Sequence, residues 1–171
     1  MSKRIKSIKA LATIAMMIAL EVVLSRFLSI PIGDSLKFGF NFVPVCVAAY
    51  LYGPLASVLV AGLGDFIGAL LMPTNTFFYG FTVTAVLTGL VFGLFLNRKY
   101  NFLRILFSVL IVQIALTIFL DALWFNIYYG TLYTVMLVTR SIKAGVMIAV
   151  QCITLSLIMP IMDRIRRQLR L

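Results

Sequence analysis

The sequence predicts an all-α integral membrane protein, a single domain over residues 1–171 with six transmembrane helices. Hydrophobic residues make up 63% of the chain and charged residues only 12%, about half the charged share of a soluble domain. A helix needs roughly 20 apolar residues to cross a bilayer, so this length holds about six crossings with short loops. Eleven of the 15 lysines and arginines lie near the two ends or at 98–104, as expected of cytoplasmic segments. Both termini are therefore expected in the cytoplasm.

The first helix is expected at 8–25, after a cluster of basic residues. It resembles a signal peptide in its basic flank, but no persuasive cleavage site follows, so it is expected to be retained. An external loop is expected over 27–37, where Pro31 lies. The second helix is expected at 36–52 and is short, with a kink at Pro44.

A tight cytoplasmic turn at Gly53-Pro54 leads into a third helix at 55–72, since proline suits the first turn of a helix. The segment 73–79 is expected to form an external loop. A fourth helix at 80–96 returns to the basic cytoplasmic loop.

The fifth helix is expected at 103–123 and leads to an external aromatic loop over 124–133. The sixth helix, at 134–162, brings the chain back to the cytoplasm. The chain is thus predicted to be a multi-pass membrane protein surrounded by the lipid bilayer.

Small residues recur on three of these helices at the spacing of one helix face. Close helix contact in lipid depends on such residues. Gly64 and Gly68 are expected to serve packing inside the bundle, as are Gly89 and Gly93. The stripe on the first helix can serve the same purpose or can form an outer surface for another membrane protein; it consists of Ala12, Ala15 and Ala19.

Charged residues inside the apolar part indicate where function lies, because such residues are costly in a membrane. Eight lie in or just above the external half of the predicted bundle: Glu21, Arg26, Asp34, Lys37, Asp65, Asp121, Arg140 and Lys143. They are expected to converge on one external mouth, together with polar and aromatic residues: Asn41, Asn75, Phe77, Phe78, Tyr79, Trp124, Asn126, Tyr128, Tyr129 and Tyr133. Aromatic walls with a few convergent polar groups suit a small planar polar ligand.

Simpler interpretations of these residues stay open. Tryptophan and tyrosine at external loops often form only an interfacial belt. A buried charge can be half of a structural ion pair, for example Glu21 with Arg26 or with Lys143. The eight charges balance, so their sum does not indicate an anionic ligand.

Several classes of function have no support in the sequence. The chain has no histidine, and Cys46 and Cys152 lie in apolar stretches, so neither a metal site nor a disulfide is expected. No phosphate-binding loop and no hydrolase motif occurs, so no cofactor is expected and any energy for transport comes from a partner. The basic charge follows topology and does not indicate nucleic acid binding. Two other classes remain: a lipid-processing enzyme that uses Asp65 and Asp121 as acid and base, and a structural protein.

The block Leu36–Gly93 resembles the substrate-binding S components of energy-coupling factor (ECF) vitamin transporters, and most resembles the folate-specific members. The shared elements are Lys37-Phe38-Gly39-Phe40, Tyr52-Gly53-Pro54, Gly64-Asp65 with Gly68, Pro73, and Phe78 to Thr82. The pair Ala15 and Ala19 also matches the pattern by which S components dock on the coupling subunit. Asn75 and Tyr79 stand where the family pattern has glycine and proline, so this loop departs from the family pattern.

The resemblance implies a high-affinity vitamin-binding subunit that is not itself an enzyme. A transmembrane coupling subunit and two ABC-type ATPases supply energy, and the S component delivers its substrate by reorienting in the membrane. The vitamin is expected to be folate, with riboflavin, thiamine or pantothenate as alternatives.

The structure of folate then suggests roles for ten residues. A carboxylate or amide at the pterin edge is expected from Asp65 or Asn75, since a carboxylate accepts two hydrogen bonds at once. Stacking is expected from Phe77, Phe78, Trp124 and Tyr128. The carboxylates of the glutamate tail are expected to meet Arg26, Lys37 or Arg140, and Lys143 is expected in the same ligand site.

Overall fold

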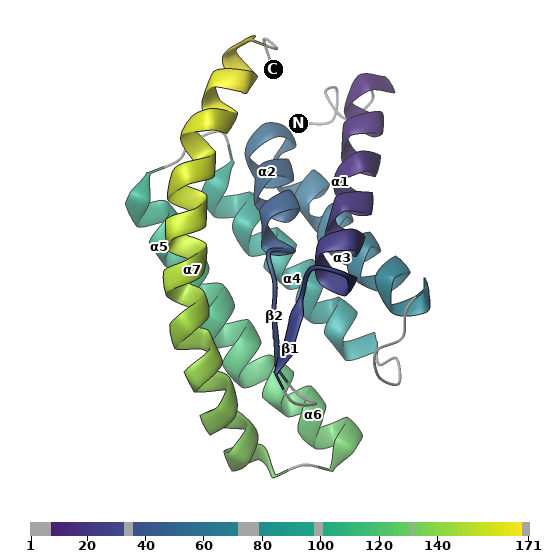
Figure 1. The fold of residues 1–171 in the computed structure, drawn as a ribbon, viewed down its shortest axis with the longest axis vertical. Coiled ribbons are helices and arrows are strands. Elements are labelled where there is room, and N and C mark those ends of the chain that lie inside the picture. The colour runs from purple at the N-terminus through teal and green to yellow at the C-terminus, as the bar shows by residue number, and fades with distance from the viewer. Residues whose placement is uncertain (1–7, 33–35, 72–78, 98–100, 131, 169–171) are drawn as a thin grey trace.

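The computed structural model describes residues 8–32, 36–71, 79–97, 101–130 and 132–168, and it shows a bundle of helices with one small hairpin (Figure 1). The helices are α1 (Ile8–Arg26), α2 (Phe42–Tyr52), α3 (Pro54–Leu71), α4 (Tyr79–Leu96), the run of α5 (Phe102–Ile111), η1 (Val112–Leu120) and α6 (Asp121–Tyr129), and α7 (Tyr133–Gln168). The fold is therefore all-α, with six helices when the uninterrupted run is counted as one.

Five of these helices are long and apolar enough to cross a membrane, whereas α2 has only 11 residues. The described ends of the chain, Ile8 and Gln168, lie at the same end of the molecule (Figure 1). An even number of crossings requires this arrangement. The end that carries Ile8 and Gln168 is called the terminal end below, and the end with α6 is called the distal end.

The start of the second helix was predicted wrongly. Residues 36–38 form strand β2 (Leu36–Phe38), which pairs antiparallel with β1 (Ile30–Ile32), and α2 begins only at Phe42. Gly39 between β2 and α2 is a poor helix former. A Cβ at that position would lie 3.2 Å from the Cβ of Ser29, so glycine also allows the chain to pass close to the end of α1. The predicted loop 27–37 is thus largely a hairpin.

The segment expected as an aromatic loop after the fifth helix is helical over most of its described residues. Trp124 to Tyr129 continue the helix as α6, which ends at Gly130 with φ of 64°. A glycine in the left-handed region is a common helix terminator because it has no Cβ to clash. The connection to α7 is therefore short, and α7 itself extends to Gln168, six residues beyond the predicted end.

Helices α3 and α4 pack closely because glycines on α4 face α3. The Ser57 hydroxyl on α3 donates to the backbone carbonyl of Gly89 at 2.7 Å. A Cβ at Gly89 would lie 2.6 Å from the backbone oxygen of Ser57, and one at Gly93 would lie 2.5 Å from its hydroxyl oxygen. The role in packing that the sequence predicts for these two glycines is confirmed.

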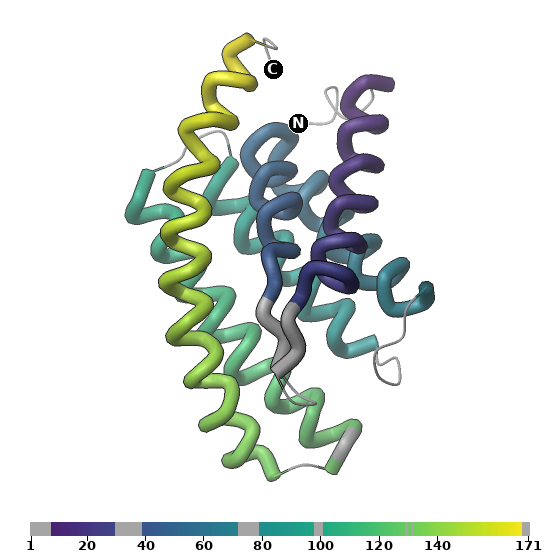
Figure 2. The backbone as a smooth tube through the Cα atoms, in the orientation of Figure 1, coloured from purple at the N-terminus to yellow at the C-terminus, as the bar shows by residue number. Residues whose placement is uncertain are grey.

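The apolar core is densest in the terminal half of the bundle. Its large and almost fully buried side chains come from the last turns of α2 and α4, the start of α5 and the second half of α7: Tyr50, Phe92, Leu96, Ile105, Leu155 and Met159. In the same half, the Tyr50 hydroxyl donates to the Asp163 carboxylate at 2.6 Å. Helix α7 runs beside the α5–η1–α6 run over most of its length (Figure 2). In the distal half, the buried Arg140 of α7 lies against η1 and α6.

Candidate functional site

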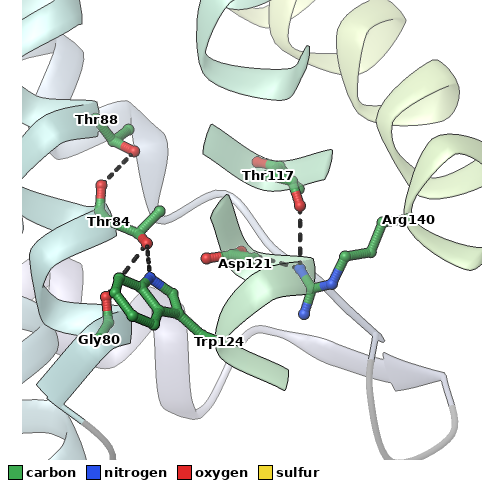
Figure 3. Close-up of polar contacts among 7 residues, drawn as sticks. All are labelled: Gly80, Thr84, Thr88, Thr117, Asp121, Trp124 and Arg140. Carbon is green, nitrogen blue, oxygen red and sulfur yellow. Dashed lines mark hydrogen bonds and ion pairs between the residues drawn. The ribbon is translucent and has the colours of Figure 1, made fainter. Parts of the chain in front are cut away.

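A buried ion pair joins α7 to the start of α6 in the distal half. The Arg140 guanidinium donates through Nη1 to Oδ2 of Asp121 at 2.9 Å, and only 3% of the arginine side chain is exposed (Figure 3). The same Nη1 donates to the backbone carbonyl of Thr117 in η1 at 3.4 Å. The guanidinium also lies 4.5 Å from the centre of the Phe125 ring, within cation–π distance. Arg140 is thus fixed by groups from η1 and α6.

Aromatic side chains of α6 extend this site towards α4. The indole N–H of Trp124 donates to the Thr84 hydroxyl oxygen at 3.2 Å (Figure 3). The Phe125 ring packs edge-on against Phe81 of α4, with 5.2 Å between ring centres. The Thr84 hydroxyl also lies within hydrogen-bonding reach of the Asp121 carboxylate. This set is called the Arg140 cluster below: Phe81, Thr84, Thr117, Asp121, Trp124, Phe125 and Arg140.

A second group of polar residues lies between α1 and α3. The Glu21 side chain of α1 is 3% exposed and lies over Gly64, and the Arg26 guanidinium lies over Gly68. A Cβ at Gly68 would come within 2.9 Å of Nε of Arg26, so the glycine spacing of α3 makes room for charged side chains. The amide of Asn41 lies within hydrogen-bonding reach of Glu21.

Asp65 belongs to this second group and connects it to α4. The Thr82 hydroxyl donates to Oδ2 of Asp65 at 2.9 Å. Asp65 and Arg26 are both close enough to Glu21 to interact with it electrostatically. The second group is called the Glu21 cluster below: Glu21, Arg26, Asn41, Asp65 and Thr82.

The two clusters meet α4 on different sides. Thr82 contacts the Glu21 cluster and Thr84 belongs to the Arg140 cluster. Residues two apart on an α-helix point about 200° apart, because each residue turns the helix by about 100°. The charges therefore form two sets on opposite faces of α4, and the expectation of one undivided mouth needs this correction.

The predicted site residues fall into three groups in the structure. Trp124 and Arg140 come together in the Arg140 cluster, and the half-buried Lys143 lies close enough to Asp121 to interact electrostatically. Arg26 and Asp65 lie in the Glu21 cluster. Tyr128 is 37% exposed on α6. Lys37 lies in β2, opposite Pro31 of β1. Asn75, Phe77 and Phe78 lie outside the described residues.

Sequence reasoning missed five contributors to these clusters. None of them carries a charge, so the search for costly charges passed over them: Phe81, Thr82, Thr84, Thr117 and Phe125. The spacing of Thr82 and Thr84 just inside the predicted fourth helix was the available signal, since two hydroxyls near an apolar helix start seek partners.

The predicted docking stripe is accessible on the outside of the bundle. Ala12, Ala15 and Ala19 are all exposed on α1. The stripe is thus available as an outer surface.

These arrangements allow recognition by charge and by stacking. The Arg140 cluster brings together the guanidinium of Arg140, the indole of Trp124 and the phenyl ring of Phe125. The Glu21 cluster offers carboxylates and an amide. Among the residues that the structure describes, no three histidine, cysteine or acidic side chains are placed to hold a metal ion.

Comparison with known proteins identifies a family and relatives of this chain. Residues 9–163 match the model of a family described as the substrate-specific component of ECF transporters. The chain is 31% identical over 163 residues to the folate transporter FolT of Clostridium novyi, covering 94% of this chain and 93% of that protein. It is 36% identical over 121 residues to the folate transporter FolT of Leuconostoc mesenteroides, covering 69% of this chain and 64% of that protein.

A solved structure shows the same fold. It is described as a crystal structure of FolT bound with folic acid, and it superposes with a TM-score of 0.80 at 30% identity. The match covers 86% of this chain and 90% of that one.

Proposed function

This chain belongs to the substrate-specific components of ECF transporters, and we propose that the substrate it binds is folate. A member of this family is a transporter subunit and not an enzyme. The observation that carries the choice of folate is the likeness over almost the whole chain to a folate transporter, together with the fold shared with a protein that binds folic acid.

The Arg140 cluster is proposed as part of the folate site. Folate carries an aromatic pterin and two carboxylates, and this cluster combines an aromatic surface at Trp124 with a guanidinium at Arg140. Lys143, one turn away on α7, adds positive charge. Tyr128 provides a further ring on α6, and the predicted partners Phe77 and Phe78 belong to the segment before α4.

The Glu21 cluster is proposed to serve the pterin edge. Asp65 accepts hydrogen bonds, as the amino-pyrimidine edge of a pterin requires. Arg26 lies beside it at the end of α1, and Lys37 lies in the hairpin that connects α1 to α2. Asn75 is the alternative to Asp65 for this role. In this proposal α4 separates the groups that meet the two ends of the ligand.

The orientation of the chain in the membrane is proposed from the distribution of its basic residues. The terminal end carries basic residues such as Arg104 and Arg164, so it is proposed to face the cytoplasm. Both clusters then lie in the external half of the bundle. The protein is proposed to reside in the cytoplasmic membrane of a prokaryote.

Import by this subunit requires partners. We propose a transmembrane coupling subunit and two ABC-type ATPases, with the exposed stripe of Ala12, Ala15 and Ala19 as the docking face. Small residues allow close approach of another helix in lipid. The bound vitamin would reach the inner face by reorientation of the whole subunit.

A ligand survey of the purified chain tests the proposal. Isothermal titration calorimetry in detergent is expected to give saturable heat with folate at a ratio of one to one, and none with riboflavin, thiamine or pantothenate at the same concentrations. Saturable heat with one of the other vitamins and none with folate would reassign the substrate and leave the family unchanged.

A further inference from the structure

The run from Phe102 to Tyr129 contains a π-helical segment, η1, over the nine residues Val112–Leu120. Such segments are rare and are often found at functional sites. At the end of η1 the amide of Asp121 donates to the carbonyl of Leu116, five residues back. At the end of α6 the amide of Gly130 donates to Asn126, four residues back.

A change from the five-residue to the four-residue spacing leaves one carbonyl without an amide donor from its own helix. The amide of Asp121 donates to Leu116, and with the four-residue spacing of α6 the next amide, of residue 122, reaches the carbonyl of residue 118. The carbonyl between these two, that of Thr117, therefore receives no amide from its own helix. This carbonyl is the one that accepts a hydrogen bond from Nη1 of Arg140 (Figure 3). A side chain of α7 thus supplies the donor that the helix itself lacks.

The hydrogen bond to the Thr117 carbonyl, called the anchor below, acts together with the other contacts of Arg140 to fix its guanidinium. Nη1 is shared by Thr117 and Asp121, and the guanidinium lies against the Phe125 ring. Nε of Arg140 is buried and has no acceptor among the described residues. A buried donor without an acceptor is costly, so this edge of the guanidinium is suited to an acceptor group on a ligand.

We propose that η1 is a positioning element of the binding site: it presents the Thr117 carbonyl to Arg140 and so holds the guanidinium with its Nε edge directed to an acceptor of the ligand. The part of this inference that concerns the ligand rests on the proposed function, whereas the anchoring of Arg140 by η1 does not. Lysine could not replace arginine here, because one ammonium group lacks the planar fork that serves a backbone carbonyl, a carboxylate and a ligand at once.

Hydrogen–deuterium exchange of the ligand-free protein tests the anchor. Arg140→Gln is expected to raise the exchange of the amides at 112–122 by about tenfold, because the Thr117 carbonyl loses its donor. Asp121→Asn, which breaks the ion pair but keeps that donor, is expected to leave this exchange within about twofold of the unmodified protein. Arg104→Gln on the same run controls for the loss of one positive charge. Equal exchange in Arg140→Gln and Asp121→Asn would overturn the proposal.

Deletion of Ala115 tests the link to binding. Ala115 is exposed in η1, and a π-helical segment corresponds to one extra residue in an α-helix, so its deletion restores α-helical spacing and keeps both flanks in register. The deletion is expected to weaken folate binding about tenfold in the otherwise unmodified chain and to have no further effect in Arg140→Gln, because both changes remove the same anchor.

The outcomes of these two tests separate the two proposals. Unchanged folate binding after the deletion, or additive losses in the double variant, would overturn the positioning role. If the deleted chain does not fold, the exchange measurement decides. If the unmodified chain does not bind folate, the proposed substrate is wrong, and the exchange measurement still decides whether η1 anchors Arg140.

Discussion

Individual residues determine the chemistry of the distal half, and Arg140 is the most constrained of them. It is 2% exposed and contacts a carboxylate, a backbone carbonyl and an aromatic ring. Two interpretations of this residue differ in a testable way. Either the pair with Asp121 only stabilises the fold, or the guanidinium also meets the ligand.

A double-variant experiment separates these interpretations. Arg140→Gln alone is expected to lower the free energy of unfolding by about 3–5 kcal/mol, because it leaves a buried carboxylate without its partner. Combining it with Asp121→Asn is expected to restore most of the stability. Folate affinity is expected to stay about 10 to 100 times weaker in both variants, since a hydrogen bond from a charged group contributes about 1.5–3 kcal/mol.

Thermal unfolding in detergent and calorimetric titration measure these two quantities. Folate binding by the double variant at the affinity of the unmodified chain would show that the pair is purely structural.

The sequence could not show which charges pair. It suggested Glu21 with Arg26 or Lys143. The structure places Arg26 close enough to Glu21 to interact electrostatically, and it also pairs Asp121 with Arg140, which the sequence did not suggest. Pairing of side chains on different helices depends on how the helices are rotated about their axes, and apolar composition leaves that rotation almost undetermined. Only the depth of each charge along its helix could be predicted.

At the scale of helices and strands, glycines decide how closely α3 and α4 approach. A Cβ at Gly89 would lie 2.6 Å from a backbone oxygen of α3, and backbone cannot yield as a flexible side chain can. Gly145 on α7 has nothing within 4 Å of the equivalent position. The two positions therefore form a matched pair.

Alanine at these two positions is expected to have opposite effects. Gly89→Ala is expected to lower the free energy of unfolding by about 1–3 kcal/mol, because α3 and α4 must separate. Gly145→Ala is expected to be neutral or to stabilise by up to about 1 kcal/mol, since alanine is the better helix former. Melting temperatures of the two variants in detergent check this, and equal destabilisation would refute the close-packing argument.

The surface of α1 carries the prediction that concerns transport. Ala15→Trp is expected to leave folate binding by the isolated chain unchanged and to abolish uptake by the complete transporter, because a large side chain blocks close approach of the coupling subunit. Leu157→Trp on α7, at a position that is 67% exposed, controls for a bulky residue facing lipid. Uptake that survives Ala15→Trp would exclude this stripe as the docking face.

The ends of α1 and α3 could be predicted to within one residue: 8–25 against Ile8–Arg26, and 55–72 against Pro54–Leu71. Apolar length determines them directly. The hairpin β1–β2 was missed because its strands have three residues each, too few for an alternating pattern to emerge. The π-helical register of η1 changes hydrogen bonding without changing hydrophobicity, so composition could not reveal it. Trp124 was assigned to a loop because its aromatic neighbours resemble an interfacial belt.

At the scale of the whole molecule, the two halves of the bundle have different tasks. The terminal half holds the dense apolar core, and the distal half holds the Arg140 cluster.

The orientation of the molecule is testable with introduced cysteines. Both native cysteines are buried, Cys46 at 0% and Cys152 at 9% exposure, so background labelling is expected to be low. In intact cells an impermeant maleimide is expected to label Leu132→Cys at the distal end and to leave Arg104→Cys unlabelled until the membrane is permeabilised. The reverse pattern would place the clusters on the cytoplasmic side.

The central claim is that folate binds this chain alone and contacts the Arg140 cluster. Trp124 is the only tryptophan of the chain, so tryptophan emission reports on that cluster directly. Titration of the purified chain with folate is expected to quench this emission saturably, at one folate per chain and over the same concentrations that give calorimetric heat. Saturable heat with unchanged tryptophan emission would place folate elsewhere on the molecule and contradict the account.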